Sequence, residues 1–330
     1  MFLKSLEDVK LNHSLIKDLE YEIQNESAIE EYFFDRVDNT FISYGKLNLS
    51  VLSVTKVDAA QNLVIIPGRG ECEYKYAYLL YCLKDININI YILFVRGNGK
   101  SSRYFKDSPK CHIESFSEYT DDIDLILSRL NINNYVLMAF SLGCLISLSY
   151  YIRYNNKPQK MALLAPFIYP YFKLPDSILF NFTKLMSLCG FKRSYTPHGK
   201  DYSFIPFNQN HHTHCQYRYE KYHKYYAQHP QLPSGGPTYN FVYKSMLEQK
   251  YLLEKDFSSD IPVLSVISME DKVVNPTHAL EFFKRHSISD QNPQIFLAHG
   301  AYHDLLNEES KFQTLSLGAA LEFLIGEFIK

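Results

Sequence analysis

Tryptophan is absent from this chain of 330 residues, and neither sign of charge dominates it: 34 Lys and Arg face 36 Asp and Glu. The formal net charge of −2 leaves no global basic field to attract nucleic acid, so we expect no nucleic-acid partner. With 46% hydrophobic and 21% charged residues, the chain is long and apolar enough for one large folded domain or two smaller ones.

Paired cysteines are also missing. The six cysteines, at positions 72, 82, 111, 144, 189 and 215, form no C-x-x-C pair. A chain of this size does not need disulfides, so free thiols in a reducing compartment are expected. The N-terminal stretch MFLKSLEDVKLNHSL carries acidic residues where a signal peptide would need an apolar core. We therefore expect a cytoplasmic protein.

Charge is missing from one long stretch, Asn134 to Ile152, whose length approaches that of a membrane-spanning helix. However, it contains Ser141, Gly143 and Ser147, and its first half has the character of a strand and its second half that of a helix. A buried strand, turn and helix explain this stretch better than a membrane span.

The chain is rich in short, continuous apolar runs bounded by turn residues, at 63–68, 90–97, 135–141, 161–167, 262–268 and 294–300. Continuous rather than alternating runs are typical of strands buried on both faces of a parallel sheet. Amphipathic helices are predicted at 114–130, 277–286 and 310–330. This alternation predicts a mostly parallel, doubly wound α/β fold.

Two segments depart from this rhythm. Residues 31–54 alternate and contain turn residues, which predicts an antiparallel hairpin at the start of the sheet. The stretch from about 168 to 250 is rich in Tyr, His and Pro and has no strand-like run. We interpret it as a helical cap inserted after the sixth strand, so that 1–167 and 251–330 form the core and 168–250 the cap.

Ser141 in 139-AFSLG-143 is the candidate nucleophile. It follows a predicted strand and precedes a predicted helix, which puts it at a carboxyl end, where α/β sheets bind ligands. The pattern is close to G-x-S-x-G, with Ala139 in place of the first glycine. That tight turn needs small residues on both sides of the serine, and alanine adds only a methyl group.

A nucleophilic serine needs a base and an acid, which in this fold follow it in the order Asp or Glu, then His. The strand at 262–268 is followed by Glu270 and Asp271, and the strand at 294–300 leads to His299 and His303. We assign Asp271 as the acid and His303 as the base, with Glu270 and His299 as alternatives.

An oxyanion hole should accompany these groups, because donors aimed at the developing charge contribute strongly to acyl transfer. The backbone N–H of Leu142, directly after the nucleophile, is one candidate. The loop 66-IPGRGE-71 supplies the other, the backbone N–H of Arg69, with Gly68 permitting close approach.

Two further patterns suggest other ligands. Residues 96-RGNGKSS-102 contain Gly-Lys-Ser, but a phosphate-binding loop would need glycine at Phe94, so nucleotide binding is rejected. The cluster 211-HHTH-214, with Cys215 and His223, fits no standard zinc spacing and is interpreted as polar cap residues. We expect neither a metal nor an organic cofactor.

Several of these stretches together carry a family resemblance: 67-PGRGECEYKYAYL-79, 96-RGNGKSSR-103, 112-HIESFSEYTDDI-123, 139-AFSLG-143, 165-APF-167, 235-GGPTYNFVYKSM-246, 270-EDKVV-274 and 300-GAYHDLLNE-308. On them the chain resembles α/β-hydrolases of the monoacylglycerol lipase and lysophospholipase group. Many members have His-Gly where this chain has Pro67-Gly68, and the acidic residue common before His-Arg-Gly is absent at Phe94 and Val95.

The resemblance implies an α/β-hydrolase fold and a serine hydrolase that cleaves the acyl ester of lysophospholipids to a fatty acid and a glycerophosphodiester, through an acyl-enzyme. It implies that Gly68, Phe140 and Tyr239 contact the substrate. We expect a phosphate to be met by Arg69 or by cap cations, namely Arg193, Arg218 or Lys221. Because the substrate lies in bilayers, the cap is expected to bind the inner face of the cytoplasmic membrane transiently.

Other readings remain open. The enzyme could be a monoacylglycerol lipase or esterase, or an acyltransferase between lysophospholipids. A non-enzymatic lipid-binding module on the same fold is the alternative outside enzymes, and the cap sequence disfavours a peptide or signal-molecule hydrolase.

Overall fold

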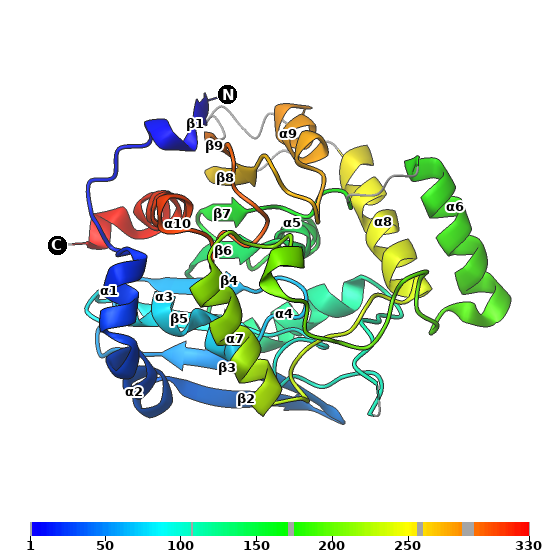
Figure 1. Cartoon of the computed structure of the whole chain (residues 1–330), viewed down its shortest axis with the longest axis horizontal. Helices are drawn as coiled ribbons and strands as arrows, with labels where there is room; N and C mark the ends of the chain where they lie inside the picture. Colours follow the sequence, from blue (N-terminus) through cyan, green and yellow to red (C-terminus); the bar gives the residue numbers. More distant parts are fainter. Residues whose placement is uncertain (1, 107, 171–174, 256–259, 286–293, 330) are drawn as a thin grey trace.

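The computed structural model describes residues 2–106, 108–170, 175–255, 260–285 and 294–329. Nine strands form one sheet in the order β1-β9-β8-β7-β6-β4-β5-β3-β2 (Figure 1). They are β1 (Phe2–Ser5), β2 (Asp38–Tyr44), β3 (Leu47–Val54), β4 (Asn62–Ile66), β5 (Asn89–Leu93), β6 (Val136–Phe140), β7 (Met161–Leu164), β8 (Val263–Ser268) and β9 (Gln294–Ala298). Only the β2–β3 and β3–β5 pairings are antiparallel among these strands.

Helices cover both faces of the sheet. The α-helices among the described residues, not all of which lie on the sheet, are α1 (Leu19–Gln24), α2 (Glu26–Arg36), α3 (Ala77–Cys82), α4 (Ser117–Arg129), α5 (Leu142–Arg153), α6 (Asp176–Met186), α7 (Gln216–Gln228), α8 (Tyr239–Glu254), α9 (Pro276–Arg285) and α10 (Ser310–Ile325). Successive strand residues supply two cores. Leu63 and Ile65 of β4 pack with α2, α3 and α10, whereas Val64 and Ile66 pack with α4, α5, α8 and α9. This is the doubly wound arrangement that continuous apolar runs predict.

Each predicted apolar run overlaps a strand, and each predicted amphipathic segment overlaps a helix, although His286 and Lys330 lie outside the described residues. The predicted hairpin at 31–54 is wrong in its first part, because residues 31–36 belong to α2 and the hairpin begins at Asp38. In that helix Phe33 is buried and Phe34 is exposed, so neighbouring aromatic residues imitate the alternation of a strand.

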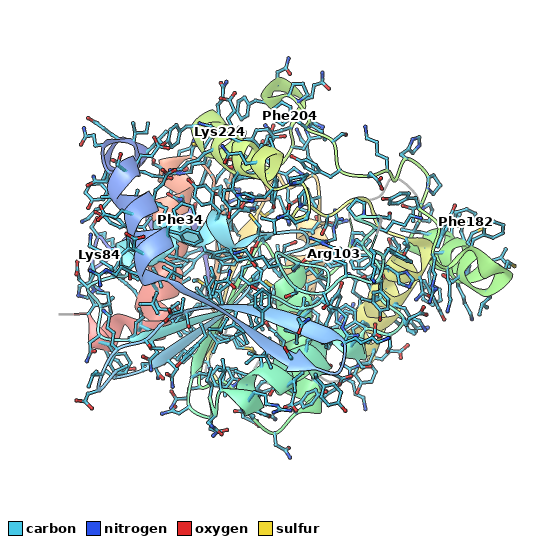
Figure 2. All side chains as sticks on the ribbon, turned by 90° about the horizontal axis from the view of Figure 1, so that it is seen from below. Phe34, Lys84, Arg103, Phe182, Phe204 and Lys224 are labelled. Carbon is cyan, nitrogen blue, oxygen red and sulfur yellow. The ribbon has the colours of Figure 1, made fainter. Side chains whose placement is uncertain are left out.

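The predicted cap region, 168–250, carries α6, α7 and most of α8, and its described residues form no strand. It follows β7 rather than the sixth strand, because β1 at Phe2–Ser5 was not predicted and shifts the count by one. Helix α6 projects at the periphery (Figure 1), and its Phe182 lies at the opposite side of the molecule from Phe34 of α2 (Figure 2).

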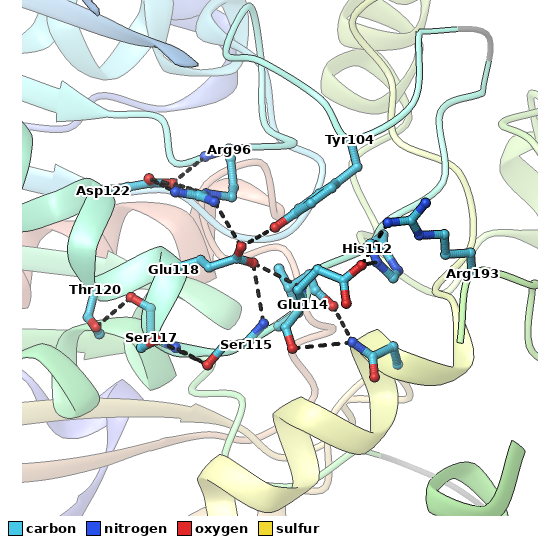
Figure 3. A network of polar contacts seen from close by, with 12 residues as sticks. Arg96, Tyr104, His112, Glu114, Ser115, Ser117, Glu118, Thr120, Asp122 and Arg193 are labelled. Carbon is cyan, nitrogen blue, oxygen red and sulfur yellow. Dashed lines mark hydrogen bonds and ion pairs between the residues drawn. The ribbon is translucent and has the colours of Figure 1, made fainter. Parts of the chain in front are cut away.

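A polar network joins the base of this region to the core (Figure 3). Glu114, in the loop before α4, accepts from Lys192 Nζ at 2.9 Å and from Arg193 Nη2 at 3.0 Å. Glu118 of α4 accepts from the Glu114 backbone N–H at 2.9 Å and pairs with Arg96 at 3.1 Å. One strand end, one core helix and the cap are therefore fixed to each other by charged groups.

Among the residues that the structure describes, no helix is both long enough and apolar enough to cross a membrane. The uncharged stretch 134–152 instead forms β6 and α5, and its residues in these two elements are buried except for Ile152.

Candidate active site

Ser141 occupies the turn between β6 and α5 with φ 47° and ψ −115°. A positive φ is costly for a residue with a side chain, so this backbone is strained and is held by its surroundings. The Ser141 N–H donates to the carbonyl of Leu164 on β7 at 3.0 Å, and the Ser141 carbonyl accepts from the N–H of Phe167 at 3.1 Å. Both bonds hold the turn against the next strand.

The two small residues beside the serine have different structural roles. A Cβ on Gly143 would lie 2.2 Å from the Ile66 carbonyl oxygen and 2.7 Å from that of Pro67, so only glycine fits there. Ala139 is fully buried in β6, and its methyl group belongs to the core beneath α4 and α5. The missing first glycine therefore does not prevent this turn.

His303 lies between Ser141 and Asp271. Its Nε2 is 2.8 Å from Ser141 Oγ, and its Nδ1 is 2.6 Å from Asp271 Oδ2. Asp271 Oδ1 accepts the backbone N–H groups of Val273 and Val274 at 2.7 and 2.9 Å, which fixes the carboxylate. The three predicted residues thus form one hydrogen-bonded chain.

The electrostatic surroundings of His303 favour the charged form of its imidazole. Burial alone would lower the pKa of His303, but the carboxylates of Asp271, Asp304 and Glu71 together outweigh it and hold this pKa above its ordinary value. The protonated form of this imidazole is therefore favoured by its surroundings. The alternatives Glu270 and His299 are both exposed and lie outside the cavity described next.

A cavity of about 520 Å³ opens beside Ser141 and His303, within the size range of ligand pockets. Gly68 and Phe140, both predicted to contact substrate, line it. Tyr239 does not line it, because it begins α8 and its ring packs against Phe182 of α6 at 5.7 Å. The predicted cap region contributes a wall of aromatic side chains, made of Tyr202, Tyr219, Tyr222, His223 and Tyr226.

The two predicted oxyanion donors belong to segments that lie close to Ser141. Leu142 is the first residue of α5, where backbone N–H groups have no partner within the helix. Arg69 lines the cavity, and the preceding N–H, that of Gly68, donates to Glu71 Oε2 at 2.8 Å. A Cβ on Gly68 would lie 3.2 Å from the Cβ of Ser141, so the loop approaches the serine closely.

Of the four cations predicted to meet a phosphate, Arg69 lines the cavity. The other three do not line it and are paired elsewhere. Arg193 pairs with Glu114, Arg218 with Glu22 at 2.6 Å, and Lys221 with Glu26 at 3.2 Å. Sequence reasoning could not see these partners, because Glu22 and Glu26 lie almost two hundred residues earlier in the chain.

His214 and His223 of the histidine cluster have different hydrogen-bond partners. His214 Nδ1 is 2.5 Å from Glu308, and His223 Nδ1 is 2.5 Å from the Tyr202 hydroxyl. Burial lowers the pKa of both His212 and His223 to about 4, so both are neutral. Within the described residues, no three His, Cys, Asp or Glu side chains are arranged to hold a metal ion.

The sequence analysis missed three buried charged residues of the site, Glu71, Lys75 and Asp304. Lys75 Nζ is 2.8 Å from Asp304 Oδ2 and 3.1 Å from Glu71 Oε1. The available signals were the position of Asp304 directly after His303, of Glu71 at the end of the loop 66–71, and of Lys75 four residues later.

Comparison with known proteins agrees with this geometry. Residues 58–310 match the family described as serine aminopeptidase, S33. The chain belongs to this family. It is an ester hydrolase with the α/β-hydrolase fold.

Individual relatives have related activities. Over 273 residues the chain is 28% identical to lysophospholipase L2 of Escherichia coli, covering 79% of both chains. Over 253 residues it is 24% identical to a probable lysophospholipase L2 of Haemophilus influenzae, covering 74% of this chain and 79% of that one.

Among solved structures, the fold is similar to a soluble variant of monoglyceride lipase from Saccharomyces cerevisiae, with a TM-score of 0.66, 15% identity and coverage of 89% and 96% of the two chains. It is also similar to a monoacylglycerol lipase of Paleococcus ferrophilus, with a TM-score of 0.64, 18% identity and coverage of 86% and 99%.

Proposed function

We propose that this S33-family hydrolase is a lysophospholipase, in which Ser141, His303 and Asp271 form the catalytic triad. The observation that carries the proposal is the hydrogen-bonded chain of these three residues at a cavity that also contains Arg69. The relatives named lysophospholipase L2 support the substrate class.

The mechanism follows from the geometry. His303 Nε2 takes the proton of Ser141 Oγ as the oxygen attacks the ester carbonyl, and Asp271 stabilises the imidazolium. The N–H groups of Arg69 and Leu142 donate to the oxyanion. His303 then protonates the departing glycerol oxygen. In the second half, His303 takes a proton from water, which attacks the acyl-enzyme and releases the fatty acid and Ser141.

Arg69 is the group that distinguishes a lysophospholipid from a neutral monoacylglycerol. Its Nη1 donates to the Gly235 carbonyl at 3.2 Å, and among the charged residues of the described cavity it has no carboxylate partner within ion-pair distance. A guanidinium presents several donors, so it can bind a phosphodiester while keeping this bond.

The decisive experiment measures fatty-acid release from lysophosphatidylethanolamine and from monoacylglycerol, for the wild type and for Ser141→Ala. The wild type should cleave the lysophospholipid, and the alanine variant should lose about 10⁴-fold or more in kcat. Arg69→Met should raise KM for the lysophospholipid and leave the monoacylglycerol KM unchanged. If Arg69→Met changed KM equally for both substrates, the result would favour a monoacylglycerol lipase.

We further propose that the protein docks on lipid bilayers through the outer face of α6 and the turn after it. Five large apolar side chains are exposed there at helical spacing: Ile178, Phe182, Leu185, Leu188 and Phe191. An apolar stripe of this kind is typical of helices that lie in a membrane interface. Figure 2 places Phe182 at the edge of the molecule.

Sedimentation with vesicles of phosphatidylethanolamine and phosphatidylglycerol tests this docking. The double variant Leu185→Ser/Leu188→Ser should bind vesicles several-fold more weakly than the wild type. Val57→Ser is the matched control, because Val57 is 91% exposed and belongs to a turn between β3 and β4. Equal binding by the wild type and the double variant would exclude α6 as the docking surface.

A further inference from the structure

Lys75 is a buried cation placed between two loops of the active site. It lies in the short 3-10 helix Glu73–Tyr76, and its side chain is only 7% exposed. A buried ammonium is costly unless it is paired, and here Asp304 and Glu71 both lie within 3.1 Å of Nζ. These carboxylates outweigh the effect of burial and hold the pKa of Lys75 above its ordinary value.

Each of the two carboxylates is attached to a different part of the reaction centre. Glu71 accepts the N–H of Gly68 at 2.8 Å and the hydroxyl of Tyr76 at 2.5 Å, so it fixes the loop that carries Arg69. Asp304 directly follows His303 in the chain.

The His303 loop is held from the cap side as well. The backbone N–H of Asp304 donates to the carbonyl of His212 at 2.8 Å, and the ring of His212 lies 6.3 Å from that of His303. A shift of Asp304 would therefore change the position of the base.

We infer that Lys75 is a positioning residue for acyl transfer, because its ammonium joins the loop of the oxyanion donor Arg69 to the loop of the base His303. This inference rests on the proposed triad and oxyanion hole. The bridge keeps the donor and the base in one geometry while the serine attacks and the oxyanion forms.

A direct contact between Lys75 and a substrate phosphate is the competing role, since Lys75 also lines the cavity. Its positive charge is already compensated by two carboxylates, and the three groups together carry a net charge of −1. A phosphate at Lys75 would therefore face both carboxylates, whereas Arg69 has no carboxylate within ion-pair distance among the described residues of this cavity. The cluster attracts the imidazolium of His303.

Both carboxylates and cations surround His303. Asp271, Asp304 and Glu71 raise its pKa against the effect of burial. The nearby cations are Lys75 and Arg69, and His212 is neutral. Loss of the Asp304 charge should therefore lower the pKa of His303.

The test compares the wild type, Lys75→Met and the control Lys221→Met. Lys221 also pairs with one carboxylate from a largely buried position, but it lies outside the cavity. Active sites are counted with a fluorophosphonate, and kcat and KM are measured on a soluble ester per titrated site. The rate constant for fluorophosphonate labelling is measured separately.

Lys75→Met should lower kcat per titrated site roughly tenfold or more while KM changes little, since small misplacements of reacting groups are costly in rate. Lys221→Met should keep the wild-type kcat. A purely structural role would reduce the number of titratable sites but not kcat per site, and that result would overturn the inference.

Asp304→Asn decides the matter if Lys75→Met fails to fold. In Asp304→Asn, the pH below which kcat/KM falls should be lower than in the wild type. An unchanged pH dependence would overturn the inference. If the wild type reacts with the fluorophosphonate but cleaves no lipid ester, the proposed function fails. The labelling rate then still tests Lys75, and it should fall roughly tenfold in Lys75→Met.

Discussion

The backbone of Gly143 lies so close to the carbonyl of Ile66 that a Cβ at position 143 would be 2.2 Å from that oxygen. Both atoms belong to rigid elements, α5 and the end of β4, so the contact cannot relax by a side-chain movement. This closeness also brings the loop 66–71, the proposed oxyanion loop, next to Ser141.

Gly143→Ala should therefore abolish hydrolysis, because the added methyl group must displace either the Ser141 turn or the 66–68 loop. The measurements are kcat and fluorophosphonate labelling. Gly326→Ala is the control: it lies at the end of α10 with ordinary helical φ, and its nearest atom is 3.9 Å from the added Cβ. Wild-type activity in Gly143→Ala would contradict the close contact.

The pH profile should report His303. In the proposed mechanism His303 accepts a proton and must therefore be neutral. Its pKa lies above the ordinary value for histidine, which is about 6.5. Activity should therefore be complete well above that pKa and fall as the pH decreases through it, starting at a higher pH than an unperturbed histidine would give.

Asp271→Asn should move this acid limb to lower pH, because the carboxylate that favours the imidazolium is lost. The same variant should lose about 10⁴-fold in kcat, since the histidine is no longer held in the productive tautomer. A limb that stays in place would assign it to another group.

Arg96→Met should destabilise the fold strongly. Asp122 is 1% exposed on its side chain, and Arg96 reaches it at 2.6 Å, so the variant leaves a buried carboxylate without its ion pair (Figure 3). The expected loss is about 3–5 kcal/mol in the free energy of unfolding, measured with urea. Lys160→Met, which breaks the more exposed pair with Glu327, should cost about 0–1 kcal/mol.

Glu22→Gln should loosen α7 from the core. Arg218 and Glu22 are 1% and 5% exposed on their side chains and lie 2.6 Å apart, so the variant leaves a buried guanidinium without its carboxylate. The expected cost is about 3 kcal/mol in unfolding, together with faster proteolysis within α7. Glu20→Gln, at an exposed position of the same α1 helix, should change neither.

Much of the fold was predictable because strands that are buried on both faces of the sheet consist of continuous apolar residues. The runs 63–68 and 135–141 contain little besides apolar residues, and they became β4 and β6. By contrast, β1 has only four residues, FLKS, with a lysine among them. It forms because its backbone pairs with the edge of β9. A pairing with a strand so distant in the sequence leaves no local sequence pattern.

In the site, the order of Ser141, Asp271 and His303 was visible because each follows an apolar run. Lys75 was not visible as part of it, since 229 residues separate it from Asp304. Residues 31–36 were misread for a different reason: aromatic residues suit both helices and strands, and only the burial of Phe33 in the finished fold decides between them.

The parallel pairing of β1 with β9 has a consequence for the order of folding. Phe2–Ser5 is synthesised almost three hundred residues before its partner Gln294–Ala298. Glu22 likewise has to be synthesised long before Arg218, the residue with which it forms an ion pair. Residues 2–5 therefore join the sheet only after β9 has been synthesised, and a nascent chain should keep them accessible to proteases until β9 has emerged.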